Sequence, residues 1–227
     1  MKIILDKYNY TPLTRNDSQY GRSYVAEGTN VPSVTTILSK TRPFEKTQKL
    51  QEWRNRVGNE EAEKITKEAS NVGTIMHNLL ESWILQTDYE PGNNMIHTQA
   101  KTMADTIKEN IKNDISEIWG SEVNLYCPEL YAGTADLVGI WKDKPAIMDF
   151  KQTNKPKKRD WIDDYFLQAA AYSLAHDELY DTEINSCAIF MCSRNFEFQL
   201  FESSGSDFEY WKDEWVKRVE QYYKKFG

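Results

Sequence analysis

A predicted β-hairpin in the middle of the chain constrains the fold more than any other feature of the sequence. Residues 134–141 and 145–151 hold side chains in the alternation that is typical of strands. The turn Lys142-Asp143-Lys144 between them is short enough to pair the two runs antiparallel. Further strands are expected at 122–127, 186–192 and 196–201. The second half of the chain is therefore expected to form a β-sheet.

Helical patterns fill most of the remaining sequence. Ser33 can cap a helix that buries Val34 and Ile37, and Ser206 begins a final helix with Glu209 as its partner in a capping box. Strands between long helices favour an α/β or α+β fold with a central mixed β-sheet flanked by helices. The first thirty residues place aromatic side chains around two glycines and suggest a short hairpin lid. Further helices are expected at about 45–69, 72–84, 98–118 and 160–175.

Composition and charge narrow the class of protein. The chain has 28 basic and 35 acidic residues, a net charge of −7, which excludes a protein that wraps nucleic acid by bulk positive charge. The three cysteines, Cys127, Cys187 and Cys192, lack C-x-x-C spacing, which argues against a disulfide framework and a four-cysteine metal site. Short apolar runs and a charged start, with no signal peptide, favour a cytoplasmic protein with no membrane contact.

The hairpin brings charged side chains together. Period-two alternation places Asp136 on one face of the first strand, and Asp149 and Lys151 on one face of the second. Folding about the turn puts Asp136 opposite Lys151 and diagonal to Asp149, within about 7–8 Å. Two carboxylates this close favour a hard divalent cation, Mg²⁺ or Mn²⁺, which polarises a phosphate and lowers the pKa of a bound water. The alternative is a salt bridge on an exposed sheet face, and the triplet alone does not decide between them.

Spaced motifs around the hairpin decide between these alternatives. The hairpin itself contains YAGTADLV at 131–138 and IMDFKQT at 147–153. The chain also has a Gly-x-x-x-His motif at Gly73–His77, a Gln-x-x-x-Tyr motif at Gln168–Tyr172, and PSVTTIL at 32–38. In this order they resemble the PD-(D/E)XK nuclease superfamily, in particular its RecB-like exonuclease branch. The segment at 32–38 is similar to the opening segment of mitochondrial genome maintenance exonucleases and their phage relatives.

The resemblance implies a restriction-endonuclease-like core with an N-terminal helical elaboration, and it assigns roles to residues. His77, Asp136 and Asp149 would bind the metal through their side chains and Phe150 through its carbonyl. Lys151 would be the catalytic lysine. Glu122 is a looser candidate for a further metal ligand, and Glu129 competes with it for that role. Gly73, one turn before His77, would let a strand or phosphate come close.

A second group of residues is expected beside the reaction centre. Gln168 and Tyr172 are four residues apart and project together from one helix, which in the family flanks the active site. An amide and a phenol there are suitable donors to a phosphate or to the attacking water, although they could instead cap the sheet edge.

Basic and polar residues are the candidates for nucleic-acid binding. The run Lys155-Pro156-Lys157-Lys158-Arg159 follows the catalytic strand and could track a DNA backbone, or it could be a solvated loop. Ser33 and Thr35 lie in the family's opening segment. Arg54 lies among aromatic and basic residues of the N-terminal part, which could line a passage for single-stranded bases.

The resemblance implies a metal-dependent DNA exonuclease, acting on single-stranded ends in replication, recombination or repair. Alternatives are a structure-selective endonuclease of the same fold and a non-catalytic DNA-binding recombination subunit. An iron–sulfur cluster is not expected, because related cluster-containing nucleases need four cysteines. A helicase, polymerase or recombinase could be a partner, in a bacterial or phage-infected cell. We expect a single nuclease domain over 1–227, with a lid and helical arch at 1–71, a catalytic core at 72–202 and a C-terminal helix at 203–227.

Overall fold

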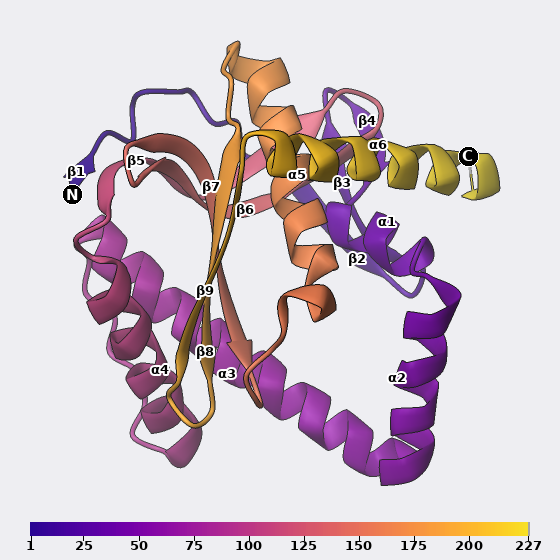
Figure 1. Cartoon of the computed structure of the whole chain (residues 1–227), viewed down its shortest axis with the longest axis vertical. Helices are drawn as coiled ribbons and strands as arrows, with labels where there is room; N and C mark the ends of the chain where they lie inside the picture. Colours follow the sequence, from indigo (N-terminus) through magenta and orange to yellow (C-terminus); the bar gives the residue numbers. More distant parts are fainter. Residues whose placement is uncertain (227) are drawn as a thin grey trace.

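A six-stranded mixed β-sheet forms the centre of the protein (Figure 1). The computed structural model describes residues 1–226. Two neighbouring pairs of strands are parallel, β1 with β5 and β7 with β8, and the other pairs are antiparallel. The predicted mixed sheet is therefore confirmed. Its strands, in spatial order, are β1 (Lys2–Ile3), β5 (Ile115–Cys127), β6 (Tyr131–Trp141), β7 (Lys144–Thr153), β8 (Ser186–Ser193) and β9 (Phe198–Ser204).

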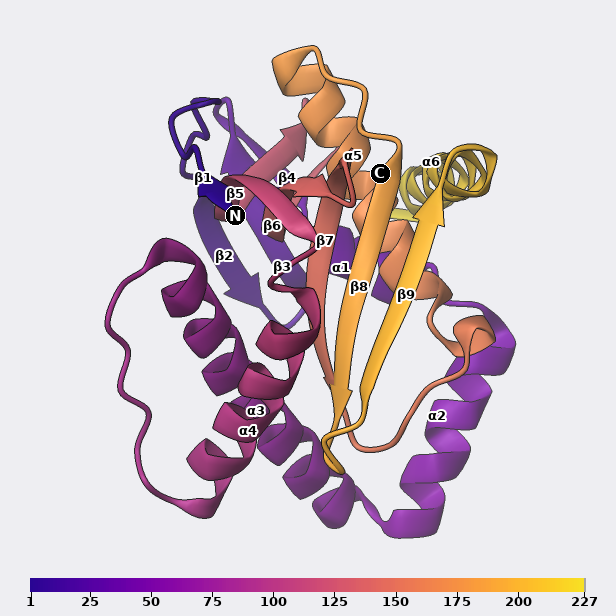
Figure 2. The same ribbon diagram turned by 60° about the vertical axis from the view of Figure 1, so that its left-hand side comes forward.

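Helices cover both faces of this sheet (Figures 1 and 2). On one face, α3 (Asn59–Leu85) and α4 (Met95–Ile111) bury Met76 and Met103 against Met148 and Phe190. The opposite face is covered by α5 (Asp163–Tyr180), α6 (Ser206–Phe226) and the short α1 (Val34–Lys40). Two cores thus share one sheet, which explains why its central strands are apolar on both sides. Within residues 1–226, no helix is both long and apolar enough to cross a membrane.

A second, three-stranded sheet packs against β6 of the main sheet. It consists of β2 (Thr14–Ser18), β3 (Gly21–Ala26) and β4 (Thr29–Pro32), each antiparallel to the next. Tyr24 and Val31 are buried against Ala132 of β6, and the Tyr24 hydroxyl lies 3.3 Å from Thr134 Oγ1. The expected two-stranded lid is therefore a three-stranded sheet anchored on the core.

The helix expected at 98–118 ends early. After α4 ends at Ile111, the main chain turns and β5 begins at Ile115. Ile111, Ile115 and Ile118 continue the three- and four-residue spacing of a helix, yet the last two lie in a strand. Register shifts in β5 let both reach the same core, although a regular strand would turn them to opposite faces.

The central hairpin turns over two residues, which corrects its predicted register. Lys142 and Asp143 have φ values of 44° and 64°, as a two-residue type I′ turn requires, and Trp141 pairs with Lys144. The last residues that pair across the hairpin are Leu137 and Met148. Asp136 therefore lies level with Asp149 and not with Lys151.

The two predicted helix caps have different outcomes. Ser33 Oγ accepts from the Thr36 amide at the start of α1, as expected. The capping box of the last helix is wrong, because Ser206 is already helical and the carbonyl of Gly205 accepts from Phe208 and Glu209. Gly205 has a φ of 58°, a conformation that glycine adopts without strain.

A helical projection connects α1 to the core helices. The projecting helix, α2 (Phe44–Val57), buries none of its residues and leads directly into α3, which runs unbroken across residues 71 and 72. At its start, Lys46 Nζ lies 3.0 Å from Asp163 and 3.5 Å from Asp164, at the beginning of α5 (Figure 1). Two ion pairs of Lys46 thus join the start of α2 to the start of α5.

The N-terminal segment is held by a buried histidine. Tyr10 donates to His176 Nε2 over 3.0 Å, and His176 Nδ1 lies 2.8 Å from Thr182 Oγ1, which itself donates to Asp177. Since Thr182 gives its proton to Asp177, it accepts from Nδ1, and the imidazole is neutral with the proton on Nδ1. Burial, together with Lys7, lowers the pKa of His176 to about 4.

This histidine predicts a loss of stability in mild acid. The unfolded state takes up a proton near pH 6.5, whereas folded His176 resists protonation until about pH 4, so stability present above pH 6.5 is lost as the pH falls toward 4. We expect urea unfolding at pH 7 and pH 4.5 to show a loss a few kcal/mol larger for the wild type than for His176→Gln. Equal losses in the two proteins would contradict this account.

Candidate active site

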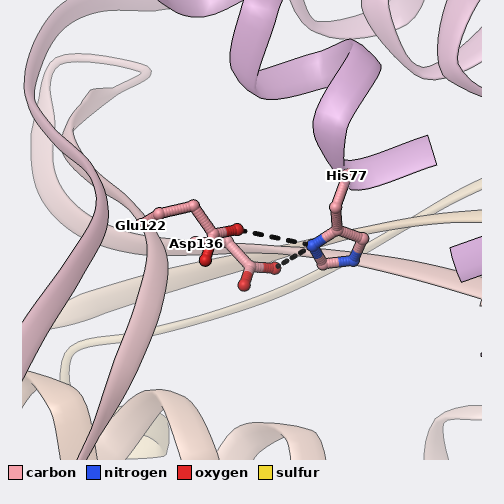
Figure 3. Close-up of side chains that lie close together, drawn as sticks. All are labelled: His77, Glu122 and Asp136. Atoms are coloured by element: carbon pink, nitrogen blue, oxygen red, sulfur yellow. Dashed lines mark ion pairs between the residues drawn. The ribbon is translucent and has the colours of Figure 1, made fainter. Parts of the chain in front are cut away.

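Three side chains from three elements meet at one end of the hairpin (Figure 3). His77 comes from α3, Glu122 from β5 and Asp136 from β6. His77 Nδ1 lies 3.6 Å from Asp136 Oδ2 and 3.7 Å from Glu122 Oε1. One nitrogen or oxygen of each lies within 4.8 Å of the others. This is the spacing of groups that share one cation.

The separation of β6 from β7 creates the site. Past the pair Leu137 and Met148, the two strands no longer pair, and side chains bind the peptide groups of β7 instead. Asp136 Oδ2 accepts from the amide of Phe150 over 2.8 Å. His77 Nε2 lies 2.9 Å from the carbonyl oxygen of Phe150 and donates to it. The main chain at Phe150 therefore fixes the orientation of both side chains.

The Phe150 carbonyl, a predicted metal ligand, is bonded to His77 and so differs in its position from the predicted side-chain ligands. Because Nε2 of His77 donates to the Phe150 carbonyl, its other nitrogen, Nδ1, faces the carboxylates. A histidine that binds a metal through one nitrogen commonly donates from the other to a carbonyl. The structure thus points the imidazole into the cluster and uses the Phe150 carbonyl to hold it there.

Glu122 reaches the cluster through an unusual backbone. Its φ is 51°, a left-handed conformation that non-glycine residues rarely adopt. Ser121 pairs with Leu137 and Val123 with Ala135, so Glu122 lies level with Asp136 across β5 and β6. The competing Glu129 lies in the turn before β6, is exposed, and is not part of the cluster. Local strain of this kind is concentrated at functional sites.

The cluster attracts positive charge. Burial would lower the pKa of His77, but Asp136 and Glu122 outweigh it and raise that pKa to about 9. On the next turn of α3, burial and the nearby Glu122 raise the pKa of Glu81. The proton on His77 compensates the negative charge of these carboxylates, and a bound cation can do so in place of that proton.

Asp149 and Lys151 form a buried pair next to the cluster. Lys151 Nζ lies 2.6 Å from Asp149 Oδ1, to which it donates, and 2.5 Å from Oδ2. Burial raises the pKa of Asp149 against the opposing effect of Lys151. Burial would lower the pKa of Lys151, but Asp149 and Asp136 outweigh it and raise that pKa. Lys151 is therefore an ammonium group.

The donor set fits a hard divalent cation. It consists of three carboxylates, which suit Mg²⁺ and Mn²⁺, and one imidazole, which suits transition-metal ions. Asp149 Oδ2 is buried and lies 2.5 Å from the Lys151 ammonium group, which compensates its charge. Asp149 therefore adds a fourth candidate ligand beside the cluster of His77, Glu122 and Asp136.

The predicted pair on α5 lies against the site. Gln168 Nε2 donates to the Tyr172 hydroxyl over 3.2 Å. Tyr172 is buried, and a Cβ added at Gly133 would lie 2.8 Å from its hydroxyl. Burial raises the pKa of Tyr172, and both Asp136 and Asp149 contribute to the shift. The structure therefore brings Gln168 and Tyr172 together beside the carboxylates.

The remaining candidates are more dispersed. Ser33 is buried and its hydroxyl is used as the α1 cap, while Thr35 beside it is exposed. Arg54 is exposed on the projecting helix α2. None of the three belongs to the ligand cluster of the described chain.

The basic residues at 155–159 follow β7 and differ in whether a carboxylate pairs with them. Arg159 donates to the Glu202 carbonyl and to Asp207, both over 2.7 Å, so its charge is neutralised. By contrast, no carboxylate of residues 1–226 lies within 4.0 Å of the ammonium group of Lys155, Lys157 or Lys158. Three of the four predicted cations remain available.

Sequence reasoning missed two residues of the site. Tyr165, in the first turn of α5, holds its ring 5.1 Å from Lys151 Nζ. It lies three and seven residues before Gln168 and Tyr172, which is the spacing of one helix face and was the available signal. The second, Glu81, lies four residues after His77 and was accessible to the same reasoning.

Substitution of Gly73 tests why α3 has a glycine at this position. A Cβ at Gly73 would meet only Gln152 Cγ, at 3.6 Å, an ordinary contact. Because alanine favours a helix interior, Gly73→Ala should leave the free energy of unfolding unchanged or raise it by up to about 1 kcal/mol. Urea denaturation measures the difference. A matched control is Gly139→Ala, whose Cβ would lie 2.2 Å from the Glu117 carbonyl oxygen and should be strongly destabilising. A clear loss of stability in Gly73→Ala would show that packing requires the glycine.

Comparisons with known proteins agree with the motifs. No protein-family model matches the chain. It is 29% identical over 219 residues to mitochondrial genome maintenance exonuclease 1 of Xenopus tropicalis, covering 90% of this chain and 60% of that protein. The mouse and human proteins of that name are each 28% identical over 209 residues, covering 86% of this chain and 60% and 59% of those proteins. The resemblance inferred from the motifs is thus confirmed, over a chain that spans about 60% of the length of these relatives.

A solved structure is also similar. It is a candidate exonuclease from Eubacterium rectale, with a TM-score of 0.48 and 13% identity, covering 70% of this chain and 65% of that one. This likeness is too weak to argue from.

Proposed function

We propose that this chain, which resembles the mitochondrial genome maintenance exonucleases along most of its length, is a divalent-metal-dependent exonuclease that hydrolyses the phosphodiester bonds of DNA. The observation that carries the proposal is the convergence of His77, Glu122 and Asp136 beside the buried pair Asp149 and Lys151. A purely structural salt bridge would not need a second cluster of carboxylates next to it. Burying such a pair also costs the desolvation of both charges, which their mutual attraction need not repay.

The residues have distinct roles in this proposal. His77, Glu122, Asp136 and Asp149 would hold Mg²⁺ or Mn²⁺, which supplies a polarised phosphate and a more acidic water. Lys151 would stabilise the negative charge that develops on the phosphate, since its carboxylate neighbours favour the ammonium form.

Other residues position the reacting groups. Gln168 donates to Tyr172 in the absence of substrate and can turn its amide toward a phosphate oxygen. The ring of Tyr165 packs on Lys151 and restricts the ammonium group to the side of the scissile phosphate. The Phe150 main chain holds Asp136 and His77 in place throughout.

The preference for strand ends rests on the resemblance, in which a helical region before the Gly-x-x-x-His motif arches over the site. In this chain that region is α2 and the first part of α3, and Lys46 of α2 pairs with Asp163 and Asp164 at the start of α5. Single-strand preference, a role in replication, recombination or repair, and a helicase, polymerase or recombinase partner stay predictions from the resemblance.

End dependence and metal dependence can be tested together. Purified protein in Mg²⁺ should degrade end-labelled linear single-stranded DNA and leave a circular form of the same sequence intact, and EDTA should abolish the reaction. Asp149→Asn should lower the rate at least about a thousandfold, because the carboxylate acts directly on the reacting centre. Its binding of linear DNA should be retained. Cutting of the circle at the linear rate would contradict the exonuclease proposal.

Tyr165 offers a second test of the proposed chemistry. Tyr165→Leu removes the ring from Lys151 and should lower kcat by about tenfold with little change in KM, since an exposed cation–π contact is worth about 1 kcal/mol and a buried one more. The matched control, Tyr165→Phe, keeps the ring and should keep the rate. Equal losses in both variants would assign the effect to the hydroxyl and not to the ring.

A further inference from the structure

An exposed tryptophan follows the basic run. Trp161 ends the 3₁₀ helix η1 (Arg159–Trp161) and leaves 60% of its surface open to solvent. Its neighbour Ile162 is 2% exposed and belongs to the core. A single exposed aromatic side chain is ordinary, so the role of Trp161 depends on the groups around it.

The segment that presents this tryptophan is fixed in place. Gln199 of β9 accepts from the amide of Lys157 over 2.7 Å and donates to its carbonyl over 2.9 Å. Arg159 is held by the Glu202 carbonyl and by Asp207. Trp161 lies between these anchors and the buried Ile162, so its exposure is a property of an ordered surface and costs little to organise on binding.

One ammonium group lies beside the exposed ring, although the exposed Asp160 directly precedes Trp161 in the chain. Lys158 Nζ lies 5.7 Å from the centre of the Trp161 ring. Together with Lys155 and Lys157 it has no carboxylate within ion-pair distance in the part of the chain that the structure describes. An indole face beside ammonium groups without partners is complementary to a nucleobase attached to a phosphate.

The position of Trp161 relates it to the reaction centre. Tyr165, four residues further along, contacts Lys151, and Asp163, two residues along, contacts Lys46 of α2. In both views the start of α5 lies beside the first turns of α2 (Figures 1 and 2). Trp161 thus precedes, in the chain, the residues of α5 that contact the projecting helix and the proposed catalytic lysine.

We propose that Trp161 and Lys158, with Lys155 and Lys157, form a binding subsite for one unpaired nucleotide of the substrate strand. The base stacks on the indole and the flanking phosphates contact the lysines. Stacking on an exposed indole needs a base whose face is free, so this subsite selects single-stranded over duplex DNA. The inference rests on the proposed function and names the part of the surface that reads strandedness.

Binding of labelled oligonucleotides tests the subsite. Asp149→Asn serves as the background, so that the DNA stays intact, and fluorescence anisotropy measures the affinity for a fluorescein-labelled oligothymidine. Trp161→Ala should weaken binding about tenfold, within the range for loss of one stacked base. Trp161→Phe, which keeps an aromatic face, should stay within about threefold of the parent. The matched control is Phe196→Ala, a large exposed side chain on the turn between β8 and β9, which should leave binding unchanged.

A second probe separates stacking from charge. An oligonucleotide of abasic sites keeps the phosphates and offers no bases, so Trp161→Ala should not weaken its binding while Lys158→Gln should. The subsite is overturned if Trp161→Ala binds oligothymidine as tightly as the parent, or if it loses affinity for the abasic strand equally. Cleavage by protein with Asp149 intact is measured in parallel. Normal cleavage with no effect of Trp161→Ala on binding rejects the subsite alone, whereas no cleavage of any DNA rejects the proposed function.

Discussion

Two side chains that hydrogen-bond to the main chain of Phe150 organise the site. Asp136 accepts from the amide of Phe150, and His77 donates to its carbonyl, at the point where β6 and β7 stop pairing. Both hydrogen bonds replace those that the ladder would have supplied, so the amide and the carbonyl of Phe150 are both paired. The same hydrogen bonds turn the imidazole Nδ1 toward Asp136 Oδ2 and Glu122 Oε1. Strand separation therefore creates the space and orients the groups that border it.

Electrostatic repulsion among the carboxylates explains why the site needs a positive charge between them. Asp136, Glu122 and Asp149 lie near one another, and the described cations beside them are Lys151 and a histidine whose pKa the carboxylates raise. Close carboxylates disfavour each other's ionisation unless positive charge lies between them. A protonated His77 meets this need in part, and a divalent cation meets it better. The site thus holds an excess of negative charge, which would repel an anionic substrate unless a cation were bound.

Alternation predicted much of the site from the sequence, because β7 is regular. Asp149 and Lys151 share a face, as period two requires, and Met148 and Phe150 are buried on the other. The register was mispredicted because one residue in the turn, Lys144, belongs to the strand. The start of β5 was missed because bulges let isoleucines with helical spacing share one core. The contact of Tyr165 with Lys151 depends on how α5 packs on the sheet, which spacing along one helix does not specify.

The location of a bound metal ion tests the central claim most directly. Crystals soaked in manganese chloride, with diffraction recorded at the manganese absorption edge, would reveal the ion by its anomalous signal. The account predicts a peak within coordinating distance of Asp136, Glu122 and His77 Nδ1, absent from Asp136→Asn crystals treated in the same way. A fully soaked crystal with no peak between these groups, and with His77 still paired to both carboxylates, would contradict it.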